Sequence, residues 1–114
     1  MQRIESKEEH TMYQKLLNSY GATPRDVHTV PVQPGREPVW FHVSVEDGAV
    51  YVESGLFHEP RSRIYGRRKL NPSECDAMLS LYHRRQRGES VAAEASRTTQ
   101  NQVYWYGIFA ELEL

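Results

Sequence analysis

Apolar residues at helical spacing predict an amphipathic helix near the N-terminus. Residues 6–9 read Ser-Lys-Glu-Glu, the pattern of a capping box, in which the serine and the glutamate satisfy free backbone N–H groups at a helix start. The apolar residues that follow at this spacing are Met12, Tyr13, Leu16, Leu17 and Tyr20. Gly21 can adopt the left-handed conformation that ends many helices, so we expect the helix to end there.

Alternation of polar and apolar residues around Asp47 and Gly48 predicts a β-hairpin over residues 39–54. An Asp-Gly pair favours a two-residue type I′ turn, because both of its positions need positive φ. Folding about this pair sets His42 opposite Glu53 and gathers five apolar residues on one face, namely Phe41, Val43, Val45, Val50 and Val52. A slip of one residue would expose all five to water, so the pattern specifies the register.

Two weaker strand signals flank the hairpin. Residues 22–38 contain prolines at positions 24, 31, 34 and 38, which predict an extended connector with one short edge strand at residues 30–33. Residues 61–69 predict a third strand through Arg63, Ile64 and Tyr65, which Gly66 ends.

A second strong helix signal begins at Asn71. Asn71 and Pro72 are typical of a helix cap and of a first helical position, and Glu74 stands where its side chain can reach back to the cap. The predicted buried stripe of this helix is Cys75, Met78, Leu79 and Tyr82. Basic residues in its last turn, before Gly88, suit the negative end of the helix dipole.

The last quarter of the chain predicts two more elements. Residues 90–97 are rich in alanine and predict a short helix. Residues 99–102 read Thr-Gln-Asn-Gln, another capping box, and open the apolar run 103–112. We predict a helix for this run from its cap and its Ala-Glu-Leu segment, with a strand as the alternative because aromatic residues favour strands.

These elements together predict an α+β fold with an N-terminal helix, a small antiparallel sheet built on the hairpin, and C-terminal helices packed on one sheet face. The 114 residues suit one compact domain over residues 1–114. No apolar run approaches the roughly 18 to 20 residues that cross a membrane, and no secretory signal is visible. Cys75 has no second cysteine to pair with, so we expect a cytoplasmic protein that does not bind membranes.

Charge is unevenly distributed along the chain. The net charge is −1, yet residues 61–87 hold eight basic and two acidic residues. Such a segment binds a polyanion, pairs with its acidic flanks or is a solvated face. We interpret it as the phosphate-contacting part of a small nucleic-acid-binding or regulatory protein whose partner is DNA or RNA. The candidate residues are Arg61, Arg63, Arg67, Arg68, Lys69, Arg84 and Arg85, with Tyr65 as a stacking side chain. A charged edge strand that resists edge-to-edge pairing is the alternative.

The order of elements after Asn71 looks like a helix-turn-helix array. Residues 90–114 resemble invertase-like segments of that kind, because Ala93 precedes Val103 and Tyr104 by a similar spacing, although Ser96 stands where the pattern has an apolar residue. The resemblance implies that amides at the start of the last helix contact base edges in the major groove. Those residues are Gln100, Asn101 and Gln102. The alternative is a packing helix or strand with its cap.

Two further functions remain open. A non-enzymatic, homodimeric interaction module would use Tyr104, Trp105, Tyr106 and Phe109, because these aromatic side chains point almost all the way round a helix and some would need a second subunit to cover them. A small metal-independent ribonuclease would use His42 paired with Glu53, and His58 with Arg61 in the next loop. The five histidines have no paired metal-ligand spacing and no glycine-rich phosphate loop is visible, so we expect neither a metal nor a cofactor.

Overall fold

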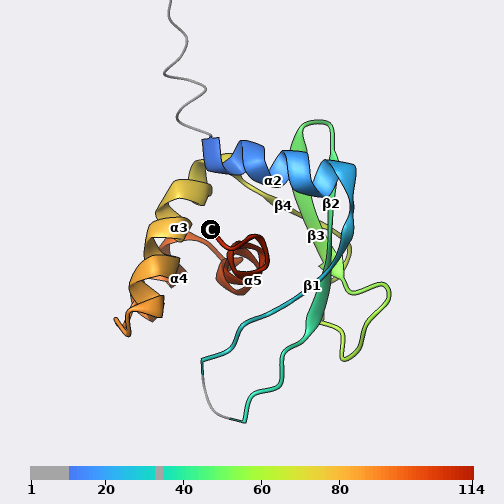
Figure 1. Cartoon of the computed structure of the whole chain (residues 1–114). Coiled ribbons are helices and arrows are strands. Elements are labelled where there is room, and N and C mark those ends of the chain that lie inside the picture. Colours follow the sequence, from blue (N-terminus) through green and yellow to red (C-terminus); the bar gives the residue numbers. More distant parts are fainter. Residues whose placement is uncertain (1–10, 33–34) are drawn as a thin grey trace, which may run out of the picture.

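The computed structural model describes residues 11–32 and 35–114, and it has the predicted α+β architecture (Figure 1). The predicted capping box at residues 6–9 lies outside this range. The elements in chain order are α2 (Thr11–Ala22), β1 (Arg25–His28), β2 (Trp40–Glu46), β3 (Ala49–Ser54), β4 (Arg68–Leu70), α3 (Pro72–Gln86), α4 (Ala92–Thr98) and α5 (Gln102–Leu112). Over the described ranges, no helix has the length and apolar character needed to cross a membrane.

The hairpin forms in the predicted register. β2 and β3 are antiparallel, with His42 opposite Glu53 and Val43 opposite Val52. Asp47 and Gly48 have φ values of 52° and 74°, the positive values that the turn requires. The strand order is β1-β2-β3-β4, so β1 and β4 are the two edges of the sheet.

The two flanking strands lie elsewhere than predicted. Residues 30–32 are not a strand, and Gln33 lies outside the described residues; the edge strand is β1, which places Val27 in the core opposite Phe41. Residues 63–65 are also not a strand, because the chain bends there and turns at Gly66. The strand begins two residues after that glycine, so that Leu70 is fully buried opposite Val50.

The helices cover one face of the sheet. Tyr13 on α2 joins the layers, since its hydroxyl donates to the Leu70 carbonyl at 2.7 Å and accepts from the Val50 N–H at 2.9 Å. Asn71 caps α3 as predicted. Glu74 does not reach back to the cap; its carboxylate accepts a hydrogen bond from the Trp105 indole at 3.2 Å.

The apolar run near the C-terminus is the helix α5, and it lies in the middle of the core (Figure 1). The helix begins later than the predicted capping box: Asn101 is the cap residue, and the Thr99 hydroxyl accepts from the Asn101 N–H. The four aromatic residues predicted as a dimer interface are all buried within this one chain, with exposures of 8% or less for Tyr104, Trp105, Tyr106 and Phe109. The sheet and α3 cover different sides of α5, so these side chains need no second subunit.

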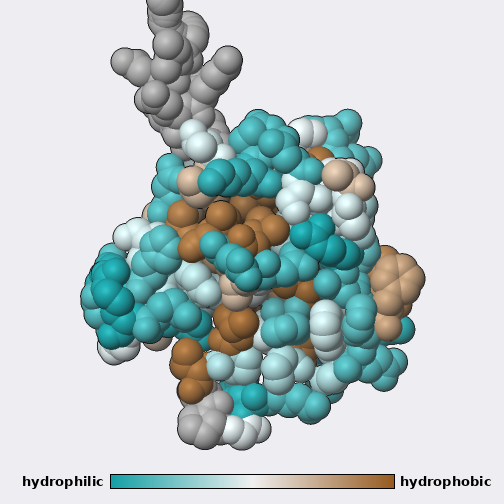
Figure 2. Space-filling model, in the orientation of Figure 1, coloured by the Kyte–Doolittle hydropathy of each residue, from teal (hydrophilic) through white to brown (hydrophobic). Residues whose placement is uncertain are grey.

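The close fit of α5 depends on Gly107. A Cβ atom at this position would lie 2.8 Å from the His28 carbonyl oxygen and 3.0 Å from two ring atoms of Phe41. Apolar surface that remains open is gathered between α2 and the end of α5, within a mostly hydrophilic face (Figure 2). The partly buried apolar residues include Met12, Leu17, Leu79 and Leu112 in the helices and Leu114 just after α5.

Candidate functional site

The basic segment does not form one continuous cationic surface. Arg67 forms a 2.6 Å ion pair with Glu46, and Arg61 lies 3.9 Å from Glu59. Arg84 bonds Glu89 and Glu94 at 2.8 and 3.1 Å. These cations are partly neutralised by acidic residues of the same chain, which is one of the three outcomes that the charge pattern allowed.

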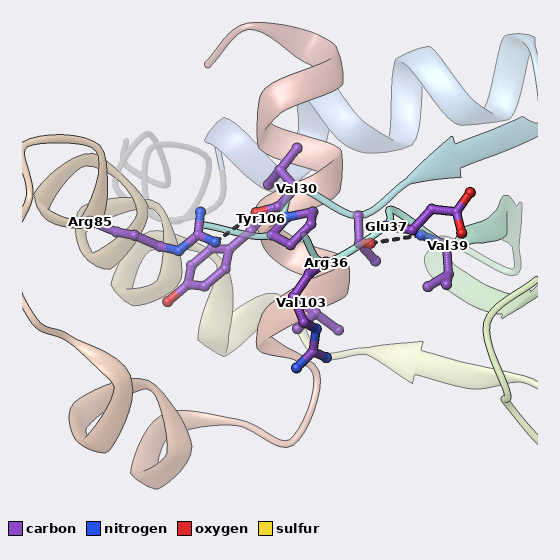
Figure 3. Close-up of a pocket in the computed structure, with 9 residues that line it drawn as sticks. Val30, Arg36, Glu37, Val39, Arg85, Val103 and Tyr106 are labelled. Atoms are coloured by element: carbon purple, nitrogen blue, oxygen red, sulfur yellow. Dashed lines mark hydrogen bonds between the residues drawn. The ribbon is translucent and has the colours of Figure 1, made fainter. Parts of the chain in front are cut away.

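Arg85 is another predicted phosphate contact, but its side chain packs within the fold (Figure 3). Its guanidinium lies over the Tyr106 ring, 4.6 Å from the centroid, and donates to the Val30 carbonyl oxygen at 2.6 Å. It lines a small pocket of about 190 Å³ together with Val103 and Thr29. Arg85 therefore holds the connector after β1 against α3 and α5.

Four of the basic side chains near the sheet edge and the α4–α5 turn have no acidic partner among the residues that the structure describes. They are Arg63, Arg68, Lys69 and Arg97, and all four are exposed. Tyr65, in the same loop as Arg63, is 98% exposed. Arg63 and Tyr65 do not lie on the predicted third strand, because residues 62–67 are a loop.

A hydrogen bond joins two segments that the sequence predicted separately, one for phosphate contacts and one for base contacts. Arg68 Nη1 on β4 donates to Asn101 Oδ1, the cap residue of α5, at 3.2 Å. Arg97, Gln100 and Asn101 line a shallow polar depression of about 400 Å³ beside this contact. We call the surface formed by Arg68, Arg97, Gln100 and Asn101 the β4–α5 corner.

The side-chain amides predicted to contact bases differ in their exposure to solvent. Gln100 is exposed, whereas Asn101 and Gln102 are partly buried and hydrogen-bonded within the chain, Gln102 to the Ser96 hydroxyl at 3.4 Å. Since α5 is buried from Tyr104 to Phe109, it cannot enter a DNA groove as a recognition helix. The packing-helix alternative describes α5.

On the sheet face opposite the helices, the carboxylate of Asp26 is the centre of a polar cluster. Its side chain is fully buried and accepts from His42 Nδ1 at 2.8 Å and His58 Nδ1 at 3.0 Å. It also accepts from three successive backbone N–H groups, of Leu56 at 3.1 Å, Phe57 at 2.7 Å and His58 at 3.0 Å. The pairing of β1 with β2 sets Asp26 opposite His42, and the loop after β3 folds back to supply the other donors.

These contacts fix the charge and the tautomers in the cluster. Burial alone would raise the pKa of the Asp26 carboxyl, but the hydrogen bonds from Phe57 N–H, His42, His58 and Leu56 N–H together hold it well below its ordinary value. A carboxylate can only accept, so both histidines carry hydrogen on Nδ1. These hydrogen bonds do not use the Nε2 atom of either ring.

A pocket of about 410 Å³ opens beside this cluster, at the β1 edge of the sheet. Trp40 lies in its wall between two imidazoles: His58 stacks on the indole at 4.0 Å between centroids, and His28 meets it edge-on at 5.1 Å. His28 Nδ1 lies 3.0 Å from the Thr29 carbonyl oxygen, so it also carries hydrogen on Nδ1. Glu111 completes the wall, with its carboxylate bonded to Arg25 and Tyr20.

The predicted ribonuclease residues are only partly brought together. His42 and His58 converge, but on Asp26 rather than on Glu53, which lies opposite His42 on β3. Asp26, His28 and Trp40 also belong to this site and were not predicted from the sequence. The only available signal was the alternation of Asp26 and His28 around Val27, and it is too short to identify a strand by itself.

No group of three histidine, cysteine, aspartate or glutamate side chains that could hold a metal occurs within residues 11–32 and 35–114. Comparison with known proteins adds no relative: no family model, no curated protein and no solved structure matches the chain. The function is therefore inferred from the geometry of these surfaces alone.

Proposed function

We propose that the chain binds single-stranded nucleic acid at the β4–α5 corner. The observation that carries the proposal is the hydrogen bond between Arg68 and Asn101, which places exposed arginines and side-chain amides on one surface. Arginine is suited to phosphate, and amides are suited to the hydrogen-bonding edges of bases.

The buried position of α5 favours a single strand over a duplex. A recognition helix must lie in the major groove, whereas α5 is buried from Tyr104 to Phe109 and reaches the surface only at its two ends. Bases of a single strand are splayed out and can meet a short turn that carries Gln100 and Asn101. Tyr65 offers an exposed ring on which a base can stack.

The charge of the surface sets the expected strength of binding. Two or three phosphate contacts give a slope of log K against log salt of roughly −1.5 to −2, using about −0.7 per contact for single strands. Binding should therefore be modest and only moderately sensitive to salt, as befits a chain whose net charge is −1.

The test is fluorescence anisotropy of labelled single-stranded RNA and DNA at several salt concentrations. Arg68→Ala and Arg97→Ala should each weaken binding on every sequence and reduce the salt slope by about one contact. Arg87→Ala is the matched control, because this exposed arginine is paired with Glu89 away from the corner. Equal loss in all three variants, or no measurable binding by the unmodified protein, would refute the proposal.

A further inference from the structure

Two imidazoles line the β1-edge pocket, and each is held in one tautomer by a hydrogen bond at Nδ1. His58 and His28 both hold their Nδ1 hydrogen on an acceptor and both contact Trp40, so their ring centroids are no farther apart than the sum of 4.0 and 5.1 Å. Each therefore presents Nε2 while its ring is held in place.

The two imidazoles differ in what supports them. His58 is held by the buried carboxylate of Asp26, which fixes the orientation and the tautomer of its ring. His42 holds the other oxygen of the same carboxylate and is itself buried, so it is a positioning residue. His28 is hydrogen-bonded only to a neutral carbonyl and is exposed. This difference assigns the base role to His58 and the acid role to His28.

Charged groups around the pocket leave room for a phosphate. The carboxylate of Glu111 is matched by Arg25 at 2.9 Å, and Asp26 is covered by its five hydrogen bonds. Arg61 pairs with Trp40 along the backbone and is held only loosely by Glu59, at 3.9 Å. Because Trp40 lines the pocket, Arg61 is the candidate cation for contact with a phosphodiester.

The loop that supplies His58 also exposes an apolar ring. Phe57 is 75% exposed, although its own N–H is fixed on Asp26. An exposed aromatic on an anchored backbone is a stacking platform for an unpaired base.

From this geometry we propose that the β1-edge pocket cleaves single-stranded RNA without a metal, with His58 as general base and His28 as general acid. Nε2 of His58 takes the proton of a ribose 2′-hydroxyl, and the 2′-oxygen forms a bond to phosphorus. The bond from phosphorus to the 5′-oxygen breaks, and that oxygen takes a proton from Nε2 of the His28 imidazolium. The products are a 2′,3′-cyclic phosphate and a 5′-hydroxyl. The inference rests on the proposed function only in that the ligand is a nucleic acid.

The experiment measures cleavage of a labelled single-stranded RNA in the presence of EDTA, with mass spectrometry of the products. His58→Asn and His28→Asn each retain a donor near the Nδ1 position and remove Nε2, so the fold should persist, as checked by the urea midpoint. Each should lose about 100-fold or more in rate. His83→Gln is the control, since His83 lies on α3 and bonds the Leu114 carbonyl through Nε2.

The same RNA with a 2′-O-methyl group at the cleaved nucleotide should be inert, and the rate should depend on pH as a bell. Cleavage of DNA at the same rate, or equal rates in the unmodified protein, His58→Asn and His28→Asn, would overturn the inference. Binding of RNA without cleavage overturns this inference and leaves the proposed function standing. Cleavage that is unchanged by Arg68→Ala and Arg97→Ala, with no loss of binding, overturns the β4–α5 corner and not the pocket.

Discussion

Gly107 offers the sharpest test of the packing, because two effects of replacing it with alanine have opposite signs. In a helix interior alanine is favoured over glycine by about 1 kcal/mol. At this position, however, the new Cβ atom would lie 2.8 Å from the His28 carbonyl oxygen and 3.0 Å from the ring of Phe41. Backbone oxygen cannot rotate away as a flexible side chain can, so α5 or β1 must shift.

Overpacking of a core costs typically about 1 to 3 kcal/mol. The nearest atom belongs to the backbone and the ring of Phe41 is fully buried, so we expect the upper part of this range. After the helix-propensity gain is subtracted, Gly107→Ala should lower the free energy of unfolding by about 1 to 2 kcal/mol.

The assay is urea denaturation followed by tryptophan fluorescence, with the slope of the free energy against urea checked for constancy. Val103→Ala is the matched control, because Val103 lies on the same helix and is 48% exposed, so only propensity should act there. If Gly107→Ala proved as stable as the unmodified protein or more stable, the close approach of α5 to β1 would be refuted.

Two further predictions concern buried polar groups. Tyr13→Phe removes the hydroxyl that bridges Leu70 and Val50 and should lower the free energy of unfolding by about 1 to 3 kcal/mol, measured by urea denaturation, whereas Tyr65→Phe should change nothing because that side chain is 98% exposed. The pKa of Asp26 is lowered in the fold, so its contribution to stability is complete above the ordinary pKa of about 4 and is lost as the pH falls further. The stability difference between the unmodified protein and Asp26→Asn should therefore be smaller at about pH 3 than at about pH 5, and an equal difference at both would contradict the role of this carboxylate.

Features set by neighbouring residues were predictable from the sequence. The Asp47-Gly48 turn and the alternating residues next to it together determine the hairpin register. Asn71 caps α3 by accepting a hydrogen bond from the Ser73 N–H, only two residues away. β1 and β4 were misplaced because four-residue and three-residue edge strands carry too few side chains to show a period.

The Asp26 cluster could not be predicted from short sequence patterns, for a different reason. Its donors lie 16 and 30 to 32 residues away in sequence, and only the folded sheet brings them together. The sequence suggested that some aromatic residues of α5 need a second subunit to cover them, because only one packing surface was assumed for the helix. In the fold, the sheet lies on one side and α3 on another, so a helix that is apolar all round belongs in the middle.

The central position of α5 has a consequence for how the protein forms during translation. The helix that fills the core is the last described element to leave the ribosome, and Phe41 packs against Tyr104, 63 positions later in the chain. Until residues 102–112 emerge, Phe41 and the β1 side of the sheet lack the cover that α5 gives them. The nascent chain is thus expected to carry exposed apolar surface for most of its synthesis and to be a client for holding chaperones.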